Sequence, residues 1–390
     1  MKILFIHNTY QQSGGEDVAV QEEIKLLRQK GHIAEAVYFD NSGIQSAYSK
    51  IKAGLRAVYN QGSFSIINNK IKDFGPDLIH LHNLFFTASP SVLYAAAKHH
   101  IPVVATIHNY RLVCANALLM RNHSPCELCI NKTFPLAGII HGCYRSSVIE
   151  SALVTTTTGL HKLAGTWRKK INQYIALTPF AKEKLLHSSL QIPTGKITVK
   201  PNFVPDYGEG NTIREDFFLF AGRLSFEKGA EIMLQSFSQL PHIKLVVAGD
   251  GPEKERLATK FGSSTNITFV GKKPAEEIIS LMQRCKALIF PSIWYEGQPY
   301  TILEAFATGT PVIASKLGAM ESLIKHELNG LHFTPGNSNE LCCAVRAFNS
   351  LTDSGAYYNN ARKTYLENHH PDVHYAEIMK IYTDAITNKQ

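Results

Sequence analysis

The fold of this chain is decided by one stretch of its second half, Pro291-Ser-Ile-Trp-Tyr-Glu296-Gly-Gln-Pro-Tyr-Thr-Ile-Leu-Glu304-Ala-Phe-Ala-Thr-Gly309-Thr-Pro-Val-Ile-Ala-Ser315. The apolar run just before it, residues 287–290, is long enough for a buried strand. Pro299 suits the first position of a helix, Gly309 suits its end, and residues 312–314 form the next expected strand. This order of elements is typical of a parallel α/β sheet.

The loop between the first strand and the helix has the chemistry of a site for a phosphorylated sugar. The first turn of a helix offers N–H groups and a positive dipole end, which suit a phosphate. Glu296 lies just before this helix and Glu304 lies inside it, and carboxylates accept hydrogen bonds from hydroxyls. Gly297 allows a ligand to approach the backbone. The alternative is that both glutamates are ordinary surface charges.

The phrase from Glu296 to Ala314 resembles the E-x7-E signature of retaining glycosyltransferases of family 4. The resemblance implies the GT-B fold, in which two doubly wound Rossmann-like α/β domains face a central cleft. It also implies that Glu296 holds the hydroxyls of the donor sugar and that Glu304 holds the ribose. The intervening residues that it assigns to the donor site are Gly297, Gln298, Pro299, Tyr300 and Thr301.

A second segment, residues 221–229, is similar to the diphosphate-binding loop of the same family. Arg223 and Lys228 lie on it, five positions apart and flanked by glycines. Two cations at this spacing can straddle a diphosphate, whereas an isolated pair would more often be surface charge. No Asp-x-Asp occurs in the chain, so we expect these cations and helix N-termini, rather than a metal ion, to neutralise the leaving group.

Two more segments, residues 249–253 and 269–273, resemble the parts of the family that shape the nucleotide pocket. Within them we assign Gly249, Gly251 and Lys272 to donor binding. We expect Lys272 to act mainly through its backbone.

The first half of the chain also alternates short apolar runs with helical segments. Strands are expected at residues 2–6, 33–39, 78–81, 103–107 and 174–177. Such alternation predicts a second doubly wound sheet, with ligands beyond the carboxyl ends of its strands.

Gly14-Gly15 and His108 follow two of these expected strands. The glycine pair alone predicts only a turn, because the dinucleotide fingerprint G-x-G-x-x-G is missing. The resemblance implies that its backbone packs against donor phosphate or acceptor, and that His108 contacts the donor sugar. The residues assigned to catalysis are Glu296, His108, Arg223 and Lys228. For His80 and His82 we favour supporting or acceptor-side roles, with metal binding as the alternative.

Cysteines gather in an insertion at about residues 111–145. They are Cys114, Cys126, Cys129 and Cys143. Four thiolates of this spacing can close a tetrahedral structural zinc site, with His123 and His141 as alternative ligands. Four reduced thiols are the other interpretation, since disulfides are rare in the cytosol. The remaining cysteines, at 285, 342 and 343, are expected in the core.

Charge is unevenly distributed along the chain. Residues 1–200 hold 22 Lys and Arg against 11 Asp and Glu, and residues 201–390 hold 18 against 21. No nucleic-acid motif accompanies the basic half, so an anionic membrane surface or acceptor is the expected partner. Basic amphipathic helices are expected at residues 159–174 and 44–58, and either could lie on lipid or pack on the sheet. The first residues do not resemble a secretory signal, so we expect a cytoplasmic protein that can attach peripherally to the inner face of the plasma membrane.

The expected organisation is an acceptor-side domain over residues 1–203, a nucleotide-sugar domain over residues 214–370 and a final helix, residues 371–390, that crosses back to the first domain. The implied reaction is retaining, metal-independent transfer of a hexosyl unit from a UDP- or GDP-sugar to an acceptor hydroxyl. By analogy the acceptor is a lipid-linked saccharide of bacterial surface polysaccharide or lipopolysaccharide synthesis. The alternatives are a GT-B sugar-phosphate synthase or phosphorylase and a non-catalytic nucleotide-sugar-binding protein. Catalysis is expected to need no cofactor, since the nucleotide sugar is a substrate and a zinc ion in the insertion would be structural.

Overall fold

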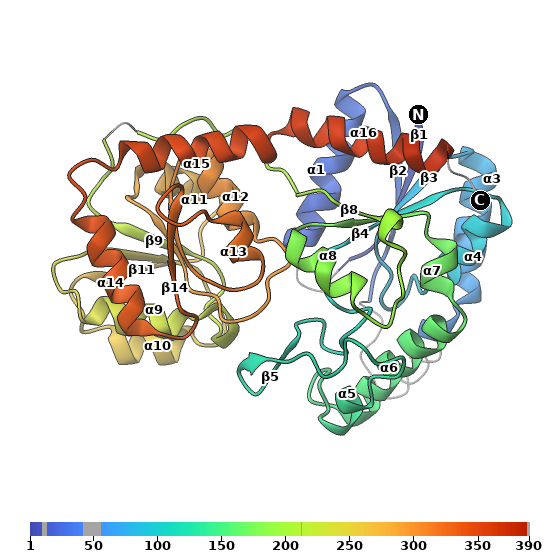
Figure 1. Ribbon diagram of the computed structural model, residues 1–390, viewed down its shortest axis with the longest axis horizontal. Helices are drawn as coiled ribbons and strands as arrows, with labels where there is room; N and C mark the ends of the chain where they lie inside the picture. Colours follow the sequence, from blue (N-terminus) through green and yellow to red (C-terminus); the bar gives the residue numbers. More distant parts are fainter. Residues whose placement is uncertain (10–13, 42–55, 212, 388–390) are drawn as a thin grey trace. The chain divides into compact units, whose positions relative to one another are not determined.

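The computed structural model describes residues 1–9, 14–41, 56–211 and 213–387. Contacts divide the chain into two compact units. Unit 1 comprises Met1–Arg121, Cys126–Pro201 and Tyr375–Gln390, and unit 2 comprises Asn122–Pro125 and Asn202–His374. Each unit contains a six-stranded sheet in which the paired strands are parallel (Figure 1).

The sheet of unit 1 has the strand order β2-β1-β3-β4-β7-β8. Its strands are β1 Lys2–Asn8, β2 Ile33–Phe39, β3 Leu78–Asn83, β4 Val103–Ile107, β7 Gln173–Ala176 and β8 Ile197–Val199. Its helices are α1 Gly15–Gln29, α3 Gln61–Phe74, α4 Ser91–Lys98, α5 Leu136–Ile140, α6 Val148–Leu163, α7 Thr166–Lys170, α8 Pro179–Leu186 and most of α16 Pro371–Thr387. The direction in which successive strands are added to the sheet reverses between β1 and β3, which makes the carboxyl ends of these two strands the expected ligand position.

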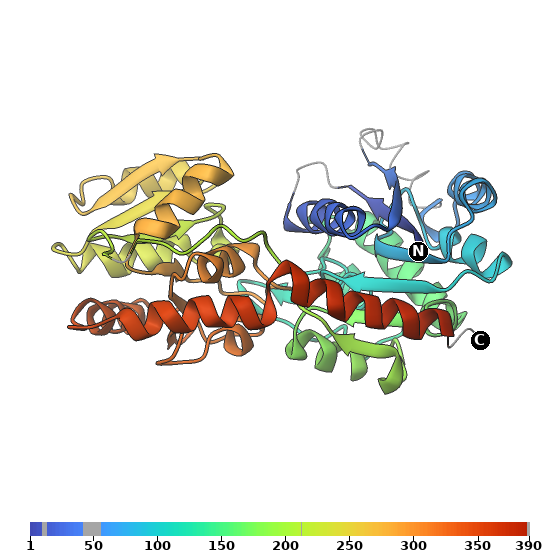
Figure 2. The ribbon, with the colours of Figure 1, turned by 90° about the horizontal axis from the view of Figure 1, so that it is seen from above.

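One face of this sheet is covered by α1 and α16, which are far apart in sequence (Figures 1 and 2). The shared core contains Ile3 and Phe5 of β1, Val20 and Leu27 of α1, and the last helix. The buried residues that α16 adds are Ile378, Ile381, Tyr382 and Ala385. The C-terminal helix is therefore part of the core of unit 1.

The sheet of unit 2 has the strand order β11-β10-β9-β12-β13-β14. Its strands are β9 Phe218–Ala221, β10 Leu245–Ala248, β11 Ile267–Gly271, β12 Leu288–Phe290, β13 Val312–Ser315 and β14 Gly330–Phe333. Its α-helices are α9 Ala230–Ser238, α10 Lys254–Phe261, α11 Ala275–Arg284, α12 Tyr300–Ala307, α13 Ala319–Leu323, α14 Ser338–Asn349 and α15 Gly355–Asn368.

Alternate strand residues of unit 2 enter two separate cores, as expected for a sheet buried on both faces. Leu219 and Leu288 pack towards α11, α12 and α15, whereas Phe218, Phe220 and Ile289 pack towards α9 and α14. The direction in which successive strands are added to the sheet reverses between β9 and β12, so the loops after these strands meet at this reversal point, which is the ligand position of such a sheet.

Two expectations about segments differ from the structure, and a third concerns residues that the structure largely does not describe. The single helix expected at residues 159–174 is wrong: α6 ends at Leu163, Gly165 adopts φ 67°, and β7 begins at Gln173. The helix expected at residues 44–58 lies largely outside the described residues. Of the three cysteines expected in the core, Cys285 and Cys342 are buried but Cys343 is exposed.

Candidate active site

The assigned donor-site residues follow the carboxyl ends of four adjacent strands of unit 2. Arg223 and Lys228 follow β9, Gly249 and Gly251 follow β10, Lys272 follows β11, and Glu296 follows β12. Residues separated by up to 73 positions are therefore gathered at one edge of the sheet because parallel strands end together. The 3-10 turn Phe226–Lys228 and the start of α12 complete this edge.

Glu296 is the most tightly held of these residues. Its side chain is 7% exposed, and its Oε1 atom accepts hydrogen bonds from Lys228 Nζ at 2.7 Å, Ser292 Oγ at 2.8 Å and Trp294 Nε1 at 2.9 Å. Three donors on one oxygen fix the plane of the carboxylate. The second oxygen, Oε2, can therefore be directed at a ligand without further reorganisation.

Arg223 and Lys228 differ in how firmly they are held. The Arg223 side chain is 57% exposed and pairs with Glu227 at 2.8 Å, while the Lys228 side chain is 22% exposed. Lys228 Nζ also lies 5.5 Å from the centre of the Trp294 ring. Lys228 is thus a fixed positive charge, and Arg223 is one that can turn to a bound anion.

Close backbone contacts join the loops after β9, β10 and β12. Gly229 has φ 68°, and a Cβ atom there would lie 2.0 Å from the carbonyl oxygen of Pro291. A Cβ atom on Gly249 would lie 1.9 Å from the carbonyl oxygen of Gly222. Only glycine permits these approaches, so both residues are needed to bring the loops after β9, β10 and β12 together.

Glu304 lies in the second turn of α12. Burial raises the pKa of its carboxyl group to about 7. A carboxylate that is costly to bury gains most from a ligand hydroxyl that donates to it.

The other residues of this stretch that the sequence assigns to the donor site differ in burial. Gln298 is buried, and its Oε1 atom accepts a hydrogen bond of 2.6 Å from the backbone N–H of Asn202. Gln298 therefore ties the start of α12 to the beginning of unit 2. Tyr300 and Thr301 form the first turn of α12 and are partly exposed.

Unit 1 carries a second polar cluster, on the sheet face that packs against α1 and α16. Alternate residues of β1 change along the strand from Ile3 and Phe5 to His7, and β3 changes from Leu78 to His80 and His82. The face is thus apolar at the amino ends of the strands and polar at the carboxyl ends, where a ligand is expected.

His108 follows β4 and joins this cluster. Its Nε2 atom lies 2.8 Å from Nδ1 of His82. Burial lowers the pKa of His108 to about 3 and that of His82 well below its usual value. Both imidazoles are therefore neutral at physiological pH and serve as hydrogen-bonding groups rather than as cations.

Gly14 and Gly15 are held at the start of α1 by Asp17. The two Asp17 carboxylate oxygens lie 2.8 Å from the Gly14 backbone nitrogen and 2.8 Å from Nε2 of His7. This contact connects the glycine turn to the end of β1, next to the histidine cluster. The sequence analysis missed His7 and Asp17.

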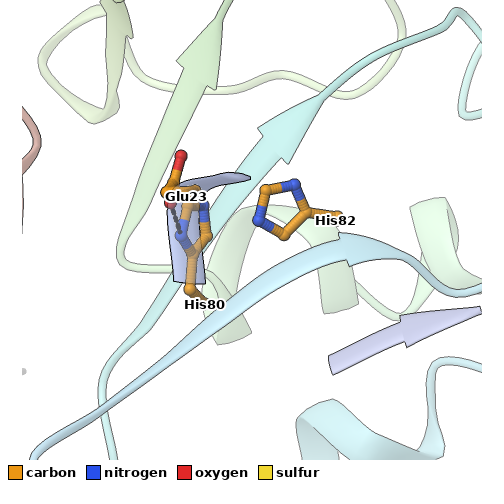
Figure 3. Close-up of side chains that lie close together, drawn as sticks. All are labelled: Glu23, His80 and His82. Carbon is orange, nitrogen blue, oxygen red and sulfur yellow. Dashed lines mark ion pairs between the residues drawn. The ribbon is translucent and has the colours of Figure 1, made fainter. Parts of the chain in front are cut away.

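Glu23 of α1 is the other residue that the sequence analysis missed. Its carboxylate lies 2.7 Å from Nδ1 of His80 (Figure 3). The hydroxyl of Tyr382 lies 3.2 Å from the same carboxylate, and Lys200 Nζ lies at 3.9 Å. The sequence did contain a signal for Glu23, because this charged residue interrupts the apolar stripe of Val20, Ile24 and Leu27 on α1.

Glu23, His80 and His82 also form a group whose donor atoms lie within 4.8 Å of one another. His80 already uses both ring nitrogens, on Glu23 and Tyr382 at one side and on Thr106 Oγ1 at 2.8 Å at the other. With Lys200 also close to Glu23, these contacts form a hydrogen-bonded network that anchors α16.

The four cysteines of the insertion all belong to unit 1. Cys114 and Cys129 are buried, and Cys126 and Cys143 are half-buried.

Family models match both halves of the chain. Residues 14–206 match the model described as Glycosyltransferase Family 4, and residues 209–364 match the model described as Glycosyl transferases group 1. An uncharacterized glycosyltransferase of Methanocaldococcus jannaschii is 31% identical over 181 residues, which are 44% of this chain and 46% of that protein. The O-antigen chain mannosyltransferase C of Escherichia coli is 29% identical over 184 residues, 46% of this chain and 49% of that protein.

Solved structures show the same fold over the whole chain. The Anabaena HepE structure in complex with UDP and glucose has a TM-score of 0.67 and 18% identity, and covers 98% of this chain and 99% of that one. The two parallel-sheet units therefore define a GT-B fold. With both halves matched by models of one enzyme class, the chain belongs to the glycosyltransferases of family 4.

Proposed function

We propose that this protein transfers a hexosyl unit from a UDP- or GDP-sugar to an acceptor hydroxyl, with retention of the anomeric configuration and without a catalytic metal ion. The observation that carries the proposal is the Glu296 carboxylate, which is buried at the reversal point of the unit 2 sheet and held by three donors beside a fixed lysine.

In this proposal Glu296 receives hydroxyl groups of the donor sugar on its Oε2 atom, and Glu304 receives the ribose hydroxyls. Arg223 and Lys228 stabilise the negative charge that develops on the departing diphosphate. The bond from the anomeric carbon to the diphosphate oxygen breaks as the acceptor oxygen bonds to the same face of that carbon. The acceptor proton passes to the departing phosphate oxygen.

The acceptor side is assigned to unit 1, and His108 of this unit donates or accepts a hydrogen bond at a hydroxyl of the donor sugar. Its low pKa supports this role because a neutral imidazole adds no charge next to the sugar. His82 positions it through the contact of 2.8 Å between their ring nitrogens.

We further propose a lipid-linked saccharide as the acceptor. An exposed apolar stripe on α6 supports this choice, since Ile149, Leu160 and Leu163 repeat at helical spacing and are 65%, 40% and 68% exposed. Leu136 and Ile140 of the neighbouring α5 are 59% and 74% exposed. Such a surface in the basic half of the chain suits the anionic inner leaflet of a bacterial membrane. Within the described residues no helix has the length and apolarity needed to span a bilayer.

The donor can be identified by thermal shift of the full chain with UDP-glucose, UDP-galactose, GDP-mannose and ADP-glucose. A ligand that binds only the folded protein raises the melting temperature. We expect one donor to give a shift in wild type and in Arg346→Ala, an exposed arginine on α14, but not in Arg223→Ala. No shift with any donor, together with no donor hydrolysis, would refute the assigned site. Release of sugar 1-phosphate when inorganic phosphate is the acceptor would instead indicate a phosphorylase.

A further inference from the structure

Unit 1 contains a cavity beyond the carboxyl ends of β3 and β4. It is partly open and has an empty volume of about 430 Å³. Its lining includes Leu81 of β3, Ala105 of β4 and Trp167 of α7. Successive residues of a strand point to opposite faces of the sheet, so Leu81 and Ala105 point away from the face that α1 and α16 cover. The cavity therefore lies on the side of the sheet where α7 packs.

The walls of this cavity are mainly apolar. Leu84, Phe85, Leu112, Trp167 and Ile171 line it, and each of them is at most 8% exposed. Well-packed protein interiors rarely leave voids larger than a water molecule, whereas pockets for small ligands measure about 300 to 1,000 Å³ and are mostly apolar. The size and the lining of this cavity therefore fit an apolar group of a ligand.

Polar residues line the cavity where the loop after β4 begins. They are His108, Asn109 and Arg111. Burial lowers the pKa of His108 to about 3, so His108 is neutral and Arg111 supplies the positive charge of this lining. Among the residues that the structure describes, no carboxylate pairs with the Arg111 side chain. Its charge is therefore available to an anionic group of the ligand.

Other contacts hold the Arg111 guanidinium in place. Its Nη1 atom donates to the carbonyl of Ala115, and its Cζ atom lies 4.7 Å from the centre of the Tyr144 ring. Arg145 approaches the same ring at 5.3 Å, while its contact with Glu150 is as long as 3.8 Å. Two guanidinium groups around one aromatic ring make a positive region beside the cavity, which suits a phosphate group.

We propose that this cavity binds the lipid end of the acceptor, with the first part of a hydrocarbon chain inside it and the phosphate that carries the chain paired with Arg111. The inference rests on the proposed function, because it names the part of the lipid-linked acceptor that unit 1 holds. Each methylene group removed from water adds to the affinity, and a charge-assisted pair with arginine adds a separate contribution. A ligand that has both parts should therefore bind more tightly than either part alone.

Octyl phosphate is a soluble probe for this site, and octanol and inorganic phosphate represent its two halves. Their binding to the full chain can be measured by calorimetry without a nucleotide sugar, below the micellar concentration of octyl phosphate. We expect octyl phosphate to bind at least about tenfold more tightly than octanol or inorganic phosphate. Arg111→Gln should remove this advantage and leave the binding of octanol unchanged. Arg346→Gln, on the exposed side of α14, is the matched control and should behave as wild type.

Ala105→Leu tests the apolar half of the site by filling the cavity from β4. We expect it to weaken the binding of both octyl phosphate and octanol by at least about tenfold. A second readout keeps the test valid if this variant does not fold. The chain has two tryptophans, and Trp294→Phe leaves Trp167 in the cavity lining as the remaining one. Octyl phosphate with a bromine atom on its chain should then quench the fluorescence of Trp167, and unlabelled octyl phosphate should not.

The outcomes separate this inference from the proposed reaction. Equal affinity for octyl phosphate and inorganic phosphate would overturn it, because the cavity would then hold no chain. Equal affinity for octyl phosphate in wild type and Arg111→Gln would also overturn it, because Arg111 would then hold no phosphate. A chain that transfers sugar without binding octyl phosphate would refute this inference alone. A chain that binds octyl phosphate as expected, but neither binds nor hydrolyses any donor, would refute the proposed reaction instead.

Discussion

Lys228 Nζ and Glu296 Oε1 lie 2.7 Å apart, although 68 residues separate them in the sequence. One residue belongs to the loop after β9 and the other to the loop after β12, so this ion pair joins the two loops at the reversal point of the unit 2 sheet. The cation assigned to the diphosphate and the carboxylate assigned to the sugar therefore form a single unit, and neither can be changed alone without consequence.

Glu296→Gln tests the sugar-binding half of this pair. The amide keeps the shape of the side chain but loses the charge, so we expect kcat/KM for transfer to fall by about 10²-fold or more. Binding of the nucleoside diphosphate alone, measured by calorimetry, should stay within about threefold of wild type because that ligand lacks the sugar. An equal loss of both would show that Glu296 acts on the nucleotide instead.

Glu304 should make nucleotide binding depend on pH. Its carboxyl has a pKa of about 7 in the free protein, so the carboxylate that accepts ribose hydroxyls is lost as pH falls below this value. We expect affinity for the nucleoside diphosphate to increase from pH 6 to pH 8 in wild type and to change less in Glu304→Gln.

Stability gives an independent check of the same carboxyl group. Its pKa is higher in the folded state than the ordinary value of 4.5, so the free energy of unfolding falls as pH rises from 4.5 to 7. Glu304→Gln should therefore be more stable than wild type at pH 8, by of the order of 1 to 3 kcal/mol, and lose this advantage near pH 4. Denaturant titrations at the two pH values measure the difference.

His108 should make unit 1 labile to acid. Its pKa is about 3 in the folded state against an ordinary value of 6.5, so its share of the stability is present above pH 6.5 and is lost as pH falls through this window. His108→Gln should flatten the pH dependence of the free energy of unfolding between pH 6.5 and 4. The matched control is His242→Gln, which removes an imidazole that lies at the surface.

Gly229→Ala should damage the donor site through the backbone. The new Cβ atom would meet the Pro291 carbonyl, and residue 229 has φ 68°. Gly336→Ala is the matched control because Gly336 has φ 82° with nothing within 4 Å of the added atom. We expect Gly336→Ala to lower the free energy of unfolding by about 1 kcal/mol and Gly229→Ala to lower it by at least twice as much. Gly229→Ala should also lose donor binding. Similar losses of stability in the two variants would mean that the loops after β9 and β12 can move apart to accommodate the added atom.

Tyr382→Phe tests the anchor of the last helix. Its hydroxyl lies 2.7 Å from Nδ1 of His80 and 3.2 Å from Glu23, so its removal leaves buried polar groups with fewer partners. We expect a loss of about 1 to 2 kcal/mol in the free energy of unfolding. Tyr375 lies near the start of the same face of α16, and its hydroxyl lies 3.0 Å from Nε2 of the half-exposed His32. Tyr375→Phe should therefore lower the free energy of unfolding by less than Tyr382→Phe does.

The sequence predicts the sheets well because their signals are local. The runs at residues 33–39 and 103–107 become β2 and β4 with the same bounds, and Gly309 follows α12 with φ 68° as a helix-ending glycine should. The helix expected at residues 159–174 failed because the apolar spacing of Leu160, Leu163 and Trp167 looks continuous in sequence. In the structure Leu163 is 68% exposed and Trp167 is buried, on two different helices.

The site residues also differ in how local their sequence signals are. Glu296, Arg223 and Lys228 were found because a contiguous phrase surrounds each of them, and the structure brings them to one sheet edge. Glu23 and Asp17 escaped notice because their partners, His80 and His7, lie on strands elsewhere in the sequence. The role of a buried carboxylate on a helix can be inferred only when the strand that it faces is known.

The packing of α16 into unit 1 has a consequence for biosynthesis. Ile378 and Tyr382 complete a core whose other members begin at Ile3, so the ribosome must have made nearly the whole chain before unit 1 can close. Residues 202–374 of unit 2, in contrast, are contiguous and can collapse while the last helix is still in the exit tunnel. The part of the chain that is synthesised first is therefore the part that finishes folding last, and its incomplete core is the surface that chaperones would have to protect during translation.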